Sequence, residues 1–207
     1  MTALELPQLY LVTPSELDVQ TFPDLLGKVL DSTDIACIRL DLSTSDEGQL
    51  TRAADACREI AHARDIPLVI TDHFLLAERL GLDGVHLSDG ARLVRKARAE
   101  LGKDAIVGAH CGTARHEGLN AGEAGADYVS FGPVGETALG DGSFAEKDLF
   151  TWWSDVVEVP IVAEGALDIA AIRDLSMITD FFAVGDEIWQ AEDPIAALAA
   201  LVAAMQP

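Results

Sequence analysis

The sequence predicts an α/β protein built as a single (βα)₈ barrel, with one domain over residues 1–207. Three observations predict this fold: short apolar runs recur eight times, amphipathic helical patterns separate most of them, and two phrases resemble each other. The phrases GLDGVHLS and AGADYVSFG lie about 40 residues apart, as expected of a barrel built from repeated units. Eight strand–helix periods favour a closed barrel over an open sheet. The 49% hydrophobic content of the 207 residues is sufficient for one large core.

The clearest strand–helix unit lies between residues 67 and 90. Its apolar runs Leu68–Ile70 and Val85–Leu87 fit strands that are buried on both faces of a parallel sheet. The apolar residues of Phe74–Leu80 predict a short helix between them. This helix ends at Gly81, because glycine readily takes the left-handed conformation found at helix C-termini. Each strand ends in polar residues, and the carboxyl ends of parallel strands are where such folds bind ligands.

The other strands are predicted from similar apolar runs bounded by polar or turn residues. In chain order, we expect strands at Leu9–Val12, Ile35–Leu40, Leu68–Ile70, Val85–Leu87, Ala105–Gly108, Tyr128–Phe131, Ile161–Ala163 and Phe181–Val184.

Helices are predicted from the 3.6-residue period and from the residues that flank it. Asp46 or Ser45 can cap the second helix, Asp193 can cap the last, and Gly102 and Gly125 close two others. In chain order, we expect helices at Phe22–Leu30, Gln49–Ala63, Phe74–Leu80, Ala91–Leu101, Ala114–Ala124, Lys147–Val157, Ile169–Leu175 and Pro194–Met205.

Charge and composition exclude several classes of partner. The net charge of −21, from 14 basic and 35 acidic residues, argues against nucleic acid, which requires a basic surface. No stretch is long enough to span a membrane, and the N-terminus lacks the parts of a signal peptide. Three cysteines without metal-ligand spacing fit a reducing cytoplasm. Trp152 and Trp153 predict core packing for one and an interface for the other, which leaves a homo-oligomer open.

Five motifs carry a resemblance to a known family. In order, they are YLVT at Tyr10–Thr13, ITD at Ile70–Asp72, DGVHLS at Asp83–Ser88, GADYVSFGPV at Gly125–Val134 and PIVAEG at Pro160–Gly165. Together they resemble the thiamine-phosphate synthase family and its TenI-like relatives over nearly the whole chain. The resemblance implies a (βα)₈ barrel that joins hydroxymethylpyrimidine diphosphate to a thiazole phosphate and releases diphosphate with help from Mg²⁺. TenI-like relatives isomerise the thiazole phosphate ring.

The resemblance and the strand ends together define a set of candidate site residues. Asp72 matches the family's metal-binding acid, and Arg39 matches an arginine that holds diphosphate. The expected catalytic residues are Arg39, Asp72 and His110. The expected ligand-binding residues are His86, Ser130, Gly132, Thr137, Glu164, Gly165 and Asp186. The expected ligands of a weakly held Mg²⁺ are Asp72 and Asp89, although Asp89 is displaced from the family position.

Several departures place acids where the family binds anions. Asp41 stands at the position of a lysine, Glu164 replaces an isoleucine beside the thiazole-phosphate cup, and Asp186 replaces a serine. Leu139 and Gly140 replace a threonine and a second lysine. At about 5 Å and an effective dielectric of about 20, a Lys-to-Asp exchange changes the interaction by ~6 kcal/mol. That corresponds to roughly four powers of ten in affinity, so we expect diphosphate chemistry by the family route to be disfavoured.

Most of these candidates also have a structural interpretation. Asp72 could cap the helix that follows it, and Asp186 suits the start of a short final turn. His86 could be a hydrogen-bonded structural residue. Arg39 could face the mouth of the barrel or pair with Asp41 or Asp72.

His110 and Glu164 are the candidates for an altered pocket. His110 replaces a family serine, and a pocket imidazole could act as an acid or a base. Glu164 follows an apolar strand at the ligand end, where a pocket role is favoured over pairing with Arg39. Two functions therefore stay open. The first is an enzyme of thiamine-related metabolism, either a synthase with an altered anion site or an isomerase that uses His110. The second is a non-catalytic barrel that binds a small heterocycle or a partner.

Overall fold

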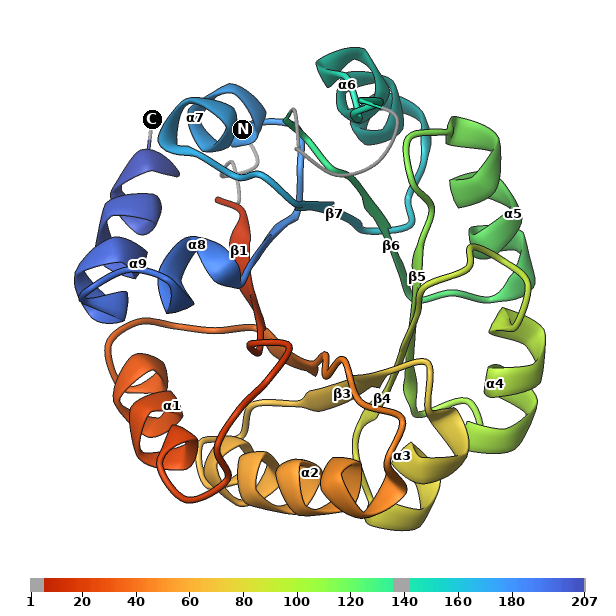
Figure 1. Cartoon of the computed structure of the whole chain (residues 1–207). Helices are drawn as coiled ribbons and strands as arrows, with labels where there is room; N and C mark the ends of the chain where they lie inside the picture. The colour runs from red at the N-terminus through yellow and green to blue at the C-terminus, as the bar shows by residue number, and fades with distance from the viewer. Residues whose placement is uncertain (1–5, 136–141, 207) are drawn as a thin grey trace.

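The computed structural model describes residues 6–135 and 142–206 as a closed barrel of parallel strands surrounded by helices (Figure 1). Neighbouring strands in the barrel are also neighbours in sequence, and β8 pairs with β1 to close it. The predicted (βα)₈ barrel is confirmed. Thr137, Leu139 and Gly140 lie outside the described residues, as does part of the Gly-rich loop between the sixth strand and the next helix.

The strands agree with the predicted positions to within two residues at each end. The largest differences are at the second strand, which starts later than expected, and at the fifth, which continues to His110. The strands are β1 (Gln8–Val12), β2 (Cys37–Leu40), β3 (Leu68–Thr71), β4 (Gly84–Leu87), β5 (Ile106–His110), β6 (Tyr128–Phe131), β7 (Ile161–Glu164) and β8 (Phe181–Val184).

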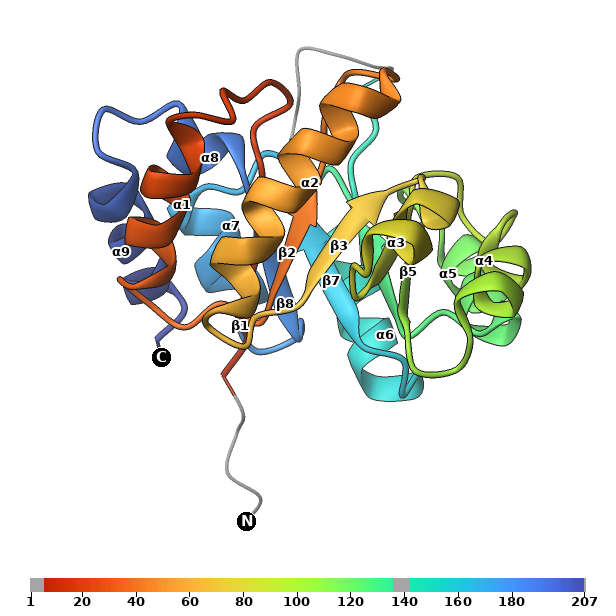
Figure 2. The ribbon, with the colours of Figure 1, turned by 90° about the horizontal axis from the view of Figure 1, so that it is seen from below.

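The helices form a ring outside the strands in Figure 1, and Figure 2 shows the same barrel from the side. They are α1 (Phe22–Leu30), α2 (Glu47–His62), α3 (Phe74–Leu80), α4 (Val94–Leu101), α5 (Arg115–Ala124), α6 (Lys147–Val156), α7 (Ile169–Leu175), α8 (Asp186–Trp189) and α9 (Pro194–Ala204). None of the described helices is both long and apolar enough to cross a membrane.

The ends of the helices follow most of the predicted signals. Asp46 caps α2 by accepting a hydrogen bond from the Gln49 backbone N–H at 2.7 Å. Gly81 ends α3 in the left-handed conformation, with φ of +63°. The predicted start of the fourth helix at Ala91 is wrong, because the chain first makes a turn in which the Val94 N–H bonds to the Ala91 carbonyl at 3.2 Å.

Side-chain alternation along the strands produces the interior of the barrel. Tyr10, Cys37, Val69, Tyr128 and Val162 form an inner apolar cluster. Residues two positions further along a strand face the same side. This alternation turns the polar residues near the carboxyl ends inward, namely Arg39, Thr71, Ser130 and Glu164. The inward direction of these four side chains therefore follows from strand register alone.

The larger core lies between the strands and the helices. Trp153 is 1% exposed and packs against Phe131 with ring centroids 5.1 Å apart. Its indole N–H donates to the Val159 carbonyl at 2.8 Å. Trp152 is half-buried under the Arg115 guanidinium, at 5.1 Å from the ring centroid. The core role expected for one tryptophan is confirmed, whereas an interface at Trp152 stays a prediction.

Candidate ligand-binding site

A cavity of about 510 Å³ lies at the carboxyl ends of the strands. Residues from β1, β2, β5, β7 and β8 and from the segments that follow β1, β2, β6, β7 and β8 line it. Six of the predicted site residues meet there: Arg39, His110, Gly132, Glu164, Gly165 and Asp186. Ligand sites in barrels occupy this end of the fold, and the volume is in the range of small-molecule pockets.

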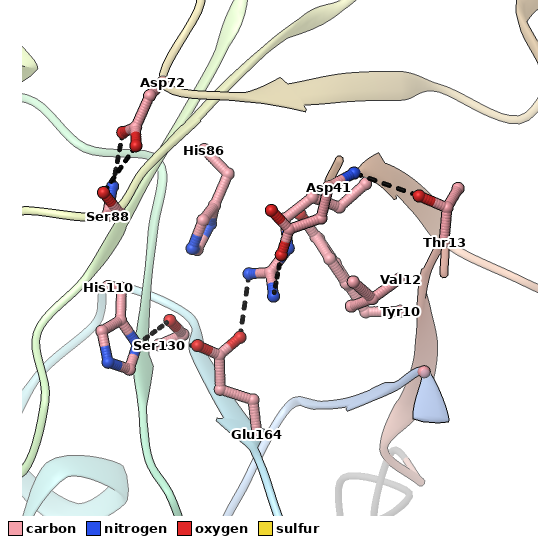
Figure 3. Close-up of polar contacts among 12 residues, drawn as sticks. Tyr10, Val12, Thr13, Asp41, Asp72, His86, Ser88, His110, Ser130 and Glu164 are labelled. Carbon is pink, nitrogen blue, oxygen red and sulfur yellow. Dashed lines mark hydrogen bonds and ion pairs between the residues drawn. The ribbon is translucent and has the colours of Figure 1, made fainter. Parts of the chain in front are cut away.

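Glu164 is the centre of the polar contacts in this cavity (Figure 3). Its Oε2 accepts a hydrogen bond from Arg39 Nη1 at 2.9 Å, and its Oε1 lies 2.7 Å from His110 Nδ1. Arg39 Nη2 is also 3.6 Å from Asp41 Oδ2. Glu164 therefore both lines the cavity and pairs with Arg39. Arg39 pairs with Asp41, one of its two predicted partners, and not with Asp72.

Burial and charge together fix the ionisation of this ion pair. Burial alone would raise the pKa of Glu164, but the Arg39 charge and the hydrogen bond with His110 hold this pKa well below its usual range. Burial would likewise lower the pKa of Arg39, yet Glu164 raises it above its ordinary value. Both groups are charged at neutral pH, and each compensates the other. The Arg39 charge is therefore already matched by a protein carboxylate.

His110 lies at the end of β5 and lines the same cavity. Its Nδ1 contacts both Glu164 and the buried Ser130 hydroxyl, the latter at 3.1 Å. Within the described residues Nε2 has no hydrogen-bond partner. A carboxylate beside Nδ1 favours a proton on that nitrogen and leaves Nε2 as an acceptor. This arrangement allows His110 to take or return a proton at a ligand atom.

A buried group of aromatic residues underlies this cavity. His86 Nδ1 is 2.9 Å from the Tyr128 hydroxyl, which is 2.6 Å from the Tyr10 hydroxyl. Burial, with the Arg39 charge, holds the pKa of His86 well below its usual range. His86 is therefore neutral and hydrogen-bonded, as its structural interpretation requires. Sequence reasoning did not select Tyr10 and Tyr128, although both lie in the motifs quoted above and alternate inward on their strands.

Gly108 makes room for this group. A Cβ atom at Gly108 would lie 2.0 Å from the Tyr128 ring, so only glycine fits there. Gly132 is constrained in a similar way, because a Cβ atom would lie 2.2 Å from the Glu164 carbonyl oxygen. Gly165 has φ of +78°, a left-handed conformation that glycine adopts without strain. The glycines of the predicted site thus allow β6 and β7 to approach closely at the cavity.

Asp72 is at the same end of the barrel but apart from Glu164 and His110 (Figure 3). Its carboxylate accepts hydrogen bonds from the Ser88 N–H at 2.8 Å and from the Ser88 hydroxyl at 2.6 Å. It does not cap α3, whose first turn has no side-chain cap. Capping of the following helix, the structural interpretation of Asp72, is therefore wrong, because the carboxylate bonds to the neighbouring β4 loop instead.

The predicted metal ligands fit an ion poorly. Asp89 pairs with Arg92 at 3.0 Å, and both oxygens of Asp72 already accept hydrogen bonds from Ser88. The described residues contain no cluster of three or more His, Cys, Asp or Glu side chains that could hold a metal. Mg²⁺ prefers several oxygen ligands and retained waters, which this pair does not supply without a bridging ligand.

Glu187 is a site residue that sequence reasoning missed. It lies on α8, next to the predicted Asp186, and both line the cavity. Its Oε2 accepts a hydrogen bond from the Gly185 N–H at 2.8 Å, and its Oε1 accepts one from the Leu167 N–H at 3.2 Å. The available signal was an acid just beyond the eighth strand, but its contact with Leu167 depends on the fold.

The fold and the site define a (βα)₈ barrel with a polar cavity at the carboxyl end of its strands. The family profile described as thiamine monophosphate synthase matches residues 9–188, and the chain belongs to this family. It is 38% identical over 184 residues to a thiamine-phosphate synthase of Rhodospirillum centenum, covering 88% of this chain and 89% of that protein. It is 36% identical over 201 residues to one of Erythrobacter litoralis, covering 93% of each.

A solved structure agrees on the fold. Thiamine phosphate pyrophosphorylase from Pyrococcus furiosus superposes with a TM-score of 0.82 at 22% identity. The superposition covers 96% of this chain and 95% of that one.

Proposed function

We propose that this protein binds a pyrimidine or thiazole heterocycle of thiamine metabolism and that the diphosphate route of its family is disfavoured in it. Family membership supports a role related to thiamine biosynthesis. The observation that carries the finer proposal is the Glu164 carboxylate bonded to Arg39 at 2.9 Å. In this arrangement a protein acid takes the position that a ligand anion would need beside the arginine.

The charges around the cavity support a ligand without phosphate. Asp41, Glu164, Asp186 and Glu187 line it together with a single arginine, Arg39. A diphosphate would therefore meet a negative potential with no unmatched cation among the described lining residues. Like charges a few ångströms apart cost several kcal/mol in a partly buried site.

The remaining surfaces suit a flat heterocycle. Val12, Ala183 and Pro133 line the cavity with apolar atoms, and among the described residues the Nε2 atom of His110 has no hydrogen-bond partner. The buried Arg39 Nε has no hydrogen-bond partner among the described residues. An unsatisfied buried donor often marks a place that water or a ligand completes.

Thiamine-phosphate synthase itself is the second candidate. The relatives that carry this name are 36–38% identical to the chain over most of its length. An assay that supplies hydroxymethylpyrimidine diphosphate and thiazole phosphate, with and without Mg²⁺, separates the two proposals. We propose Mg²⁺ only as a weakly held ion near Asp72. Formation of thiamine phosphate at a rate typical of enzymes would favour the synthase, whereas absence of product would favour the binding barrel.

The proposed cellular setting follows from the sequence. We propose a cytoplasmic protein that acts on a small molecule and has no nucleic-acid partner, since the net charge is −21. A homo-oligomer is compatible with this proposal, and sedimentation would establish the assembly state.

Paired thermal shifts test the ligand class directly. We expect hydroxymethylpyrimidine, aminopyrimidines or thiamine to raise the melting temperature more than their phosphate esters do, because the esters add charge to a negative cavity. Binding to the folded state raises stability according to ligand concentration over Kd. Consistently larger shifts with the esters, reduced in Arg39→Ala, would show that a phosphate site survives and would favour the synthase.

A further inference from the structure

A second cavity, of about 250 Å³, opens at the amino-terminal end of the barrel. Its walls come from β1, β2, β5, β6, β7 and β8 and from the segments that precede β2 and β3. Gln8 at its rim is exposed and Phe181 is half-buried, so the cavity is open to solvent. The buried rings of Tyr10 and Tyr128 form its inner wall. This cavity shares no lining residue with the one at the carboxyl ends of the strands.

The lining of the amino-terminal cavity is mainly apolar and, among the described residues, contains no charged side chain. The chain as a whole, in contrast, has a net charge of −21. Val162 belongs to the inner apolar cluster of the barrel, and Ile106 and Phe181 pack against that cluster. A charged ligand would lose its hydration here without gaining an ionic partner, whereas a neutral apolar ligand has no such cost.

The polar atoms of the inner wall already have partners. The Tyr10 and Tyr128 hydroxyls are 2.6 Å apart, and the Tyr128 hydroxyl is 2.9 Å from His86 Nδ1. Both hydroxyl protons can therefore be donated within this group. The Cys37 thiol donates to the Ile38 carbonyl at 3.7 Å, and burial raises its pKa to about 12, so it is neutral. Water gains few hydrogen bonds at such a wall, and cavities with apolar walls bind apolar molecules.

The size and the rings of this cavity favour a small aromatic molecule. An apolar cavity of about 150 Å³ is sufficient to bind benzene, and the amino-terminal cavity is larger. The Tyr10 and Tyr128 rings stand 5.6 Å apart at an interplanar angle of 61°, and Phe181 adds a third ring nearer the rim. Aromatic molecules gain from offset or edge-to-face contacts with such rings in addition to the area that they bury.

We propose that the amino-terminal cavity is a second ligand site, which binds a small neutral molecule with one aromatic ring. The proposal does not rest on the proposed function, because it concerns the opposite end of the barrel. The ligand enters beside Gln8 and packs against Tyr10, Tyr128 and Phe181. A ring that carries a carboxylate or an ammonium group binds more weakly, although an acidic protein attracts cations in general.

Methyl NMR signals locate the ligand within the barrel. Ile106 lines the amino-terminal cavity, Val12 lines the carboxyl-end cavity, and Val107 belongs to the core between strands and helices. The probe is toluene, titrated into the wild-type protein up to its solubility limit. We expect a saturable shift of the Ile106 methyl signals, with those of Val12 and Val107 unchanged. No shift at Ile106, or a shift at Val12 alone, would overturn the proposal.

Charged analogues of toluene test the chemical class of the ligand. Benzylamine and benzoate present the same ring with an ammonium or a carboxylate group. At matched ionic strength, we expect both to need at least a tenfold higher concentration than toluene to shift the Ile106 signals equally. The comparison is made at Ile106 because a cation could also bind in the acidic cavity at the other end. A shift at Ile106 with either charged probe at the concentration that toluene requires would contradict the proposal.

Two substitutions at one position test the role of the cavity volume. Cys37→Phe places a ring of the chain in the cavity, whereas Cys37→Val removes the thiol and leaves most of the space. In the wild type and Cys37→Val, toluene at tenfold above its Kd should raise the melting temperature by about 3–5 °C. Cys37→Phe should lose this rise. A rise retained in Cys37→Phe would refute the site, and if that variant fails to fold, the Ile106 shifts of the wild type decide.

Discussion

At the scale of single residues, the Arg39–Glu164 ion pair is the feature with the largest energetic consequence. Glu164 contacts Arg39 at 2.9 Å and His110 at 2.7 Å, in a position where its side chain is 14% exposed. A buried ion pair is weakly stabilising as a whole, but the loss of one partner leaves an uncompensated charge. Removal of Glu164 should therefore cost more free energy of folding than removal of the acid paired with a surface arginine.

Glu164→Gln should reveal this dependence. The variant keeps the side-chain shape, but among the described residues it leaves Asp41, at 3.6 Å, as the only carboxylate paired with Arg39. We expect the free energy of unfolding at pH 7 to fall by about 3 kcal/mol, measured by urea denaturation. Glu158→Gln, at an exposed position, is the control and should change it by less than about 0.5 kcal/mol. Equal losses in the two variants would contradict the prediction.

The difference in unfolding free energy between the wild type and Glu164→Gln should depend on pH with a definite sign. The folded-state pKa of Glu164 lies below its ordinary value of 4.5. The carboxylate therefore contributes stability above that value, and this contribution is lost as pH falls toward the folded-state pKa. The gap between wild type and Glu164→Gln should be constant near neutral pH and narrow below about pH 4.5. A gap that widens on acidification would show that another group carries the effect.

At the scale of elements, three aspartates link neighbouring strands at the end of the barrel opposite the cavity. Asp83 accepts from the Leu68 N–H at 2.7 Å, Asp127 from the Val107 N–H at 2.7 Å, and Asp180 from an N–H of β7 at 2.8 Å. Each acid stands just before one strand and bonds to the start of the strand before it. The repeated phrases GLDG and GADY contain two of these acids, so part of the repeat serves strand pairing.

Asp127→Ala should destabilise the barrel without changing the cavity. The substitution removes the side-chain acceptor of the Val107 N–H and the carboxylate paired with Arg98, whose guanidinium keeps its backbone carbonyl partners. We expect a loss of about 2 kcal/mol in the free energy of unfolding, since hydrogen bonds to charged groups contribute ~1.5–3 kcal/mol. The control is Asp55→Ala, which breaks the half-buried pair with Arg58 at the barrel surface and should cost less than ~1 kcal/mol.

The loss of stability in Asp127→Ala and the unchanged cavity can be tested separately. Asp127 lies at the amino-terminal end of β6, and conserved function in barrels resides at the opposite end. Thermal shifts with heterocycles should therefore be the same in Asp127→Ala as in the wild type. Altered ligand shifts would mean that the aspartate network also shapes the cavity.

At the scale of the whole molecule, periodicity in the sequence predicted the barrel, and strand ends predicted which residues share its mouth. Arg39, His110 and Glu164 meet because each lies at or near the carboxyl end of a strand, a property that one sequence displays. Their partners were harder to predict, because Glu164 faces both Arg39 and His110 across the cavity. The contact between Glu187 and Leu167 could not be predicted, since it depends on the conformations of two loops.

The overall charge leads to a last prediction about salt. Like charges at a net −21 repel each other in the compact state more than in the expanded chain. Raising the ionic strength from about 0.01 M to about 0.1 M shortens the screening length from ~30 Å to ~10 Å. This change weakens that repulsion but affects the buried Arg39–Glu164 pair little.

We therefore expect added sodium chloride to stabilise the protein over this range. Exposed ion pairs such as Lys147–Asp174 oppose the effect only slightly, because surface pairs contribute ~0–1 kcal/mol each. A gain of about 1 kcal/mol corresponds to a melting temperature higher by ~2–4 °C for a chain of this size. Calorimetric scans in sodium and potassium chloride separate screening, which is common to both salts, from binding of one ion. A melting temperature that falls with both salts would mean that attractive surface pairs, and not net repulsion, dominate the electrostatics of the fold.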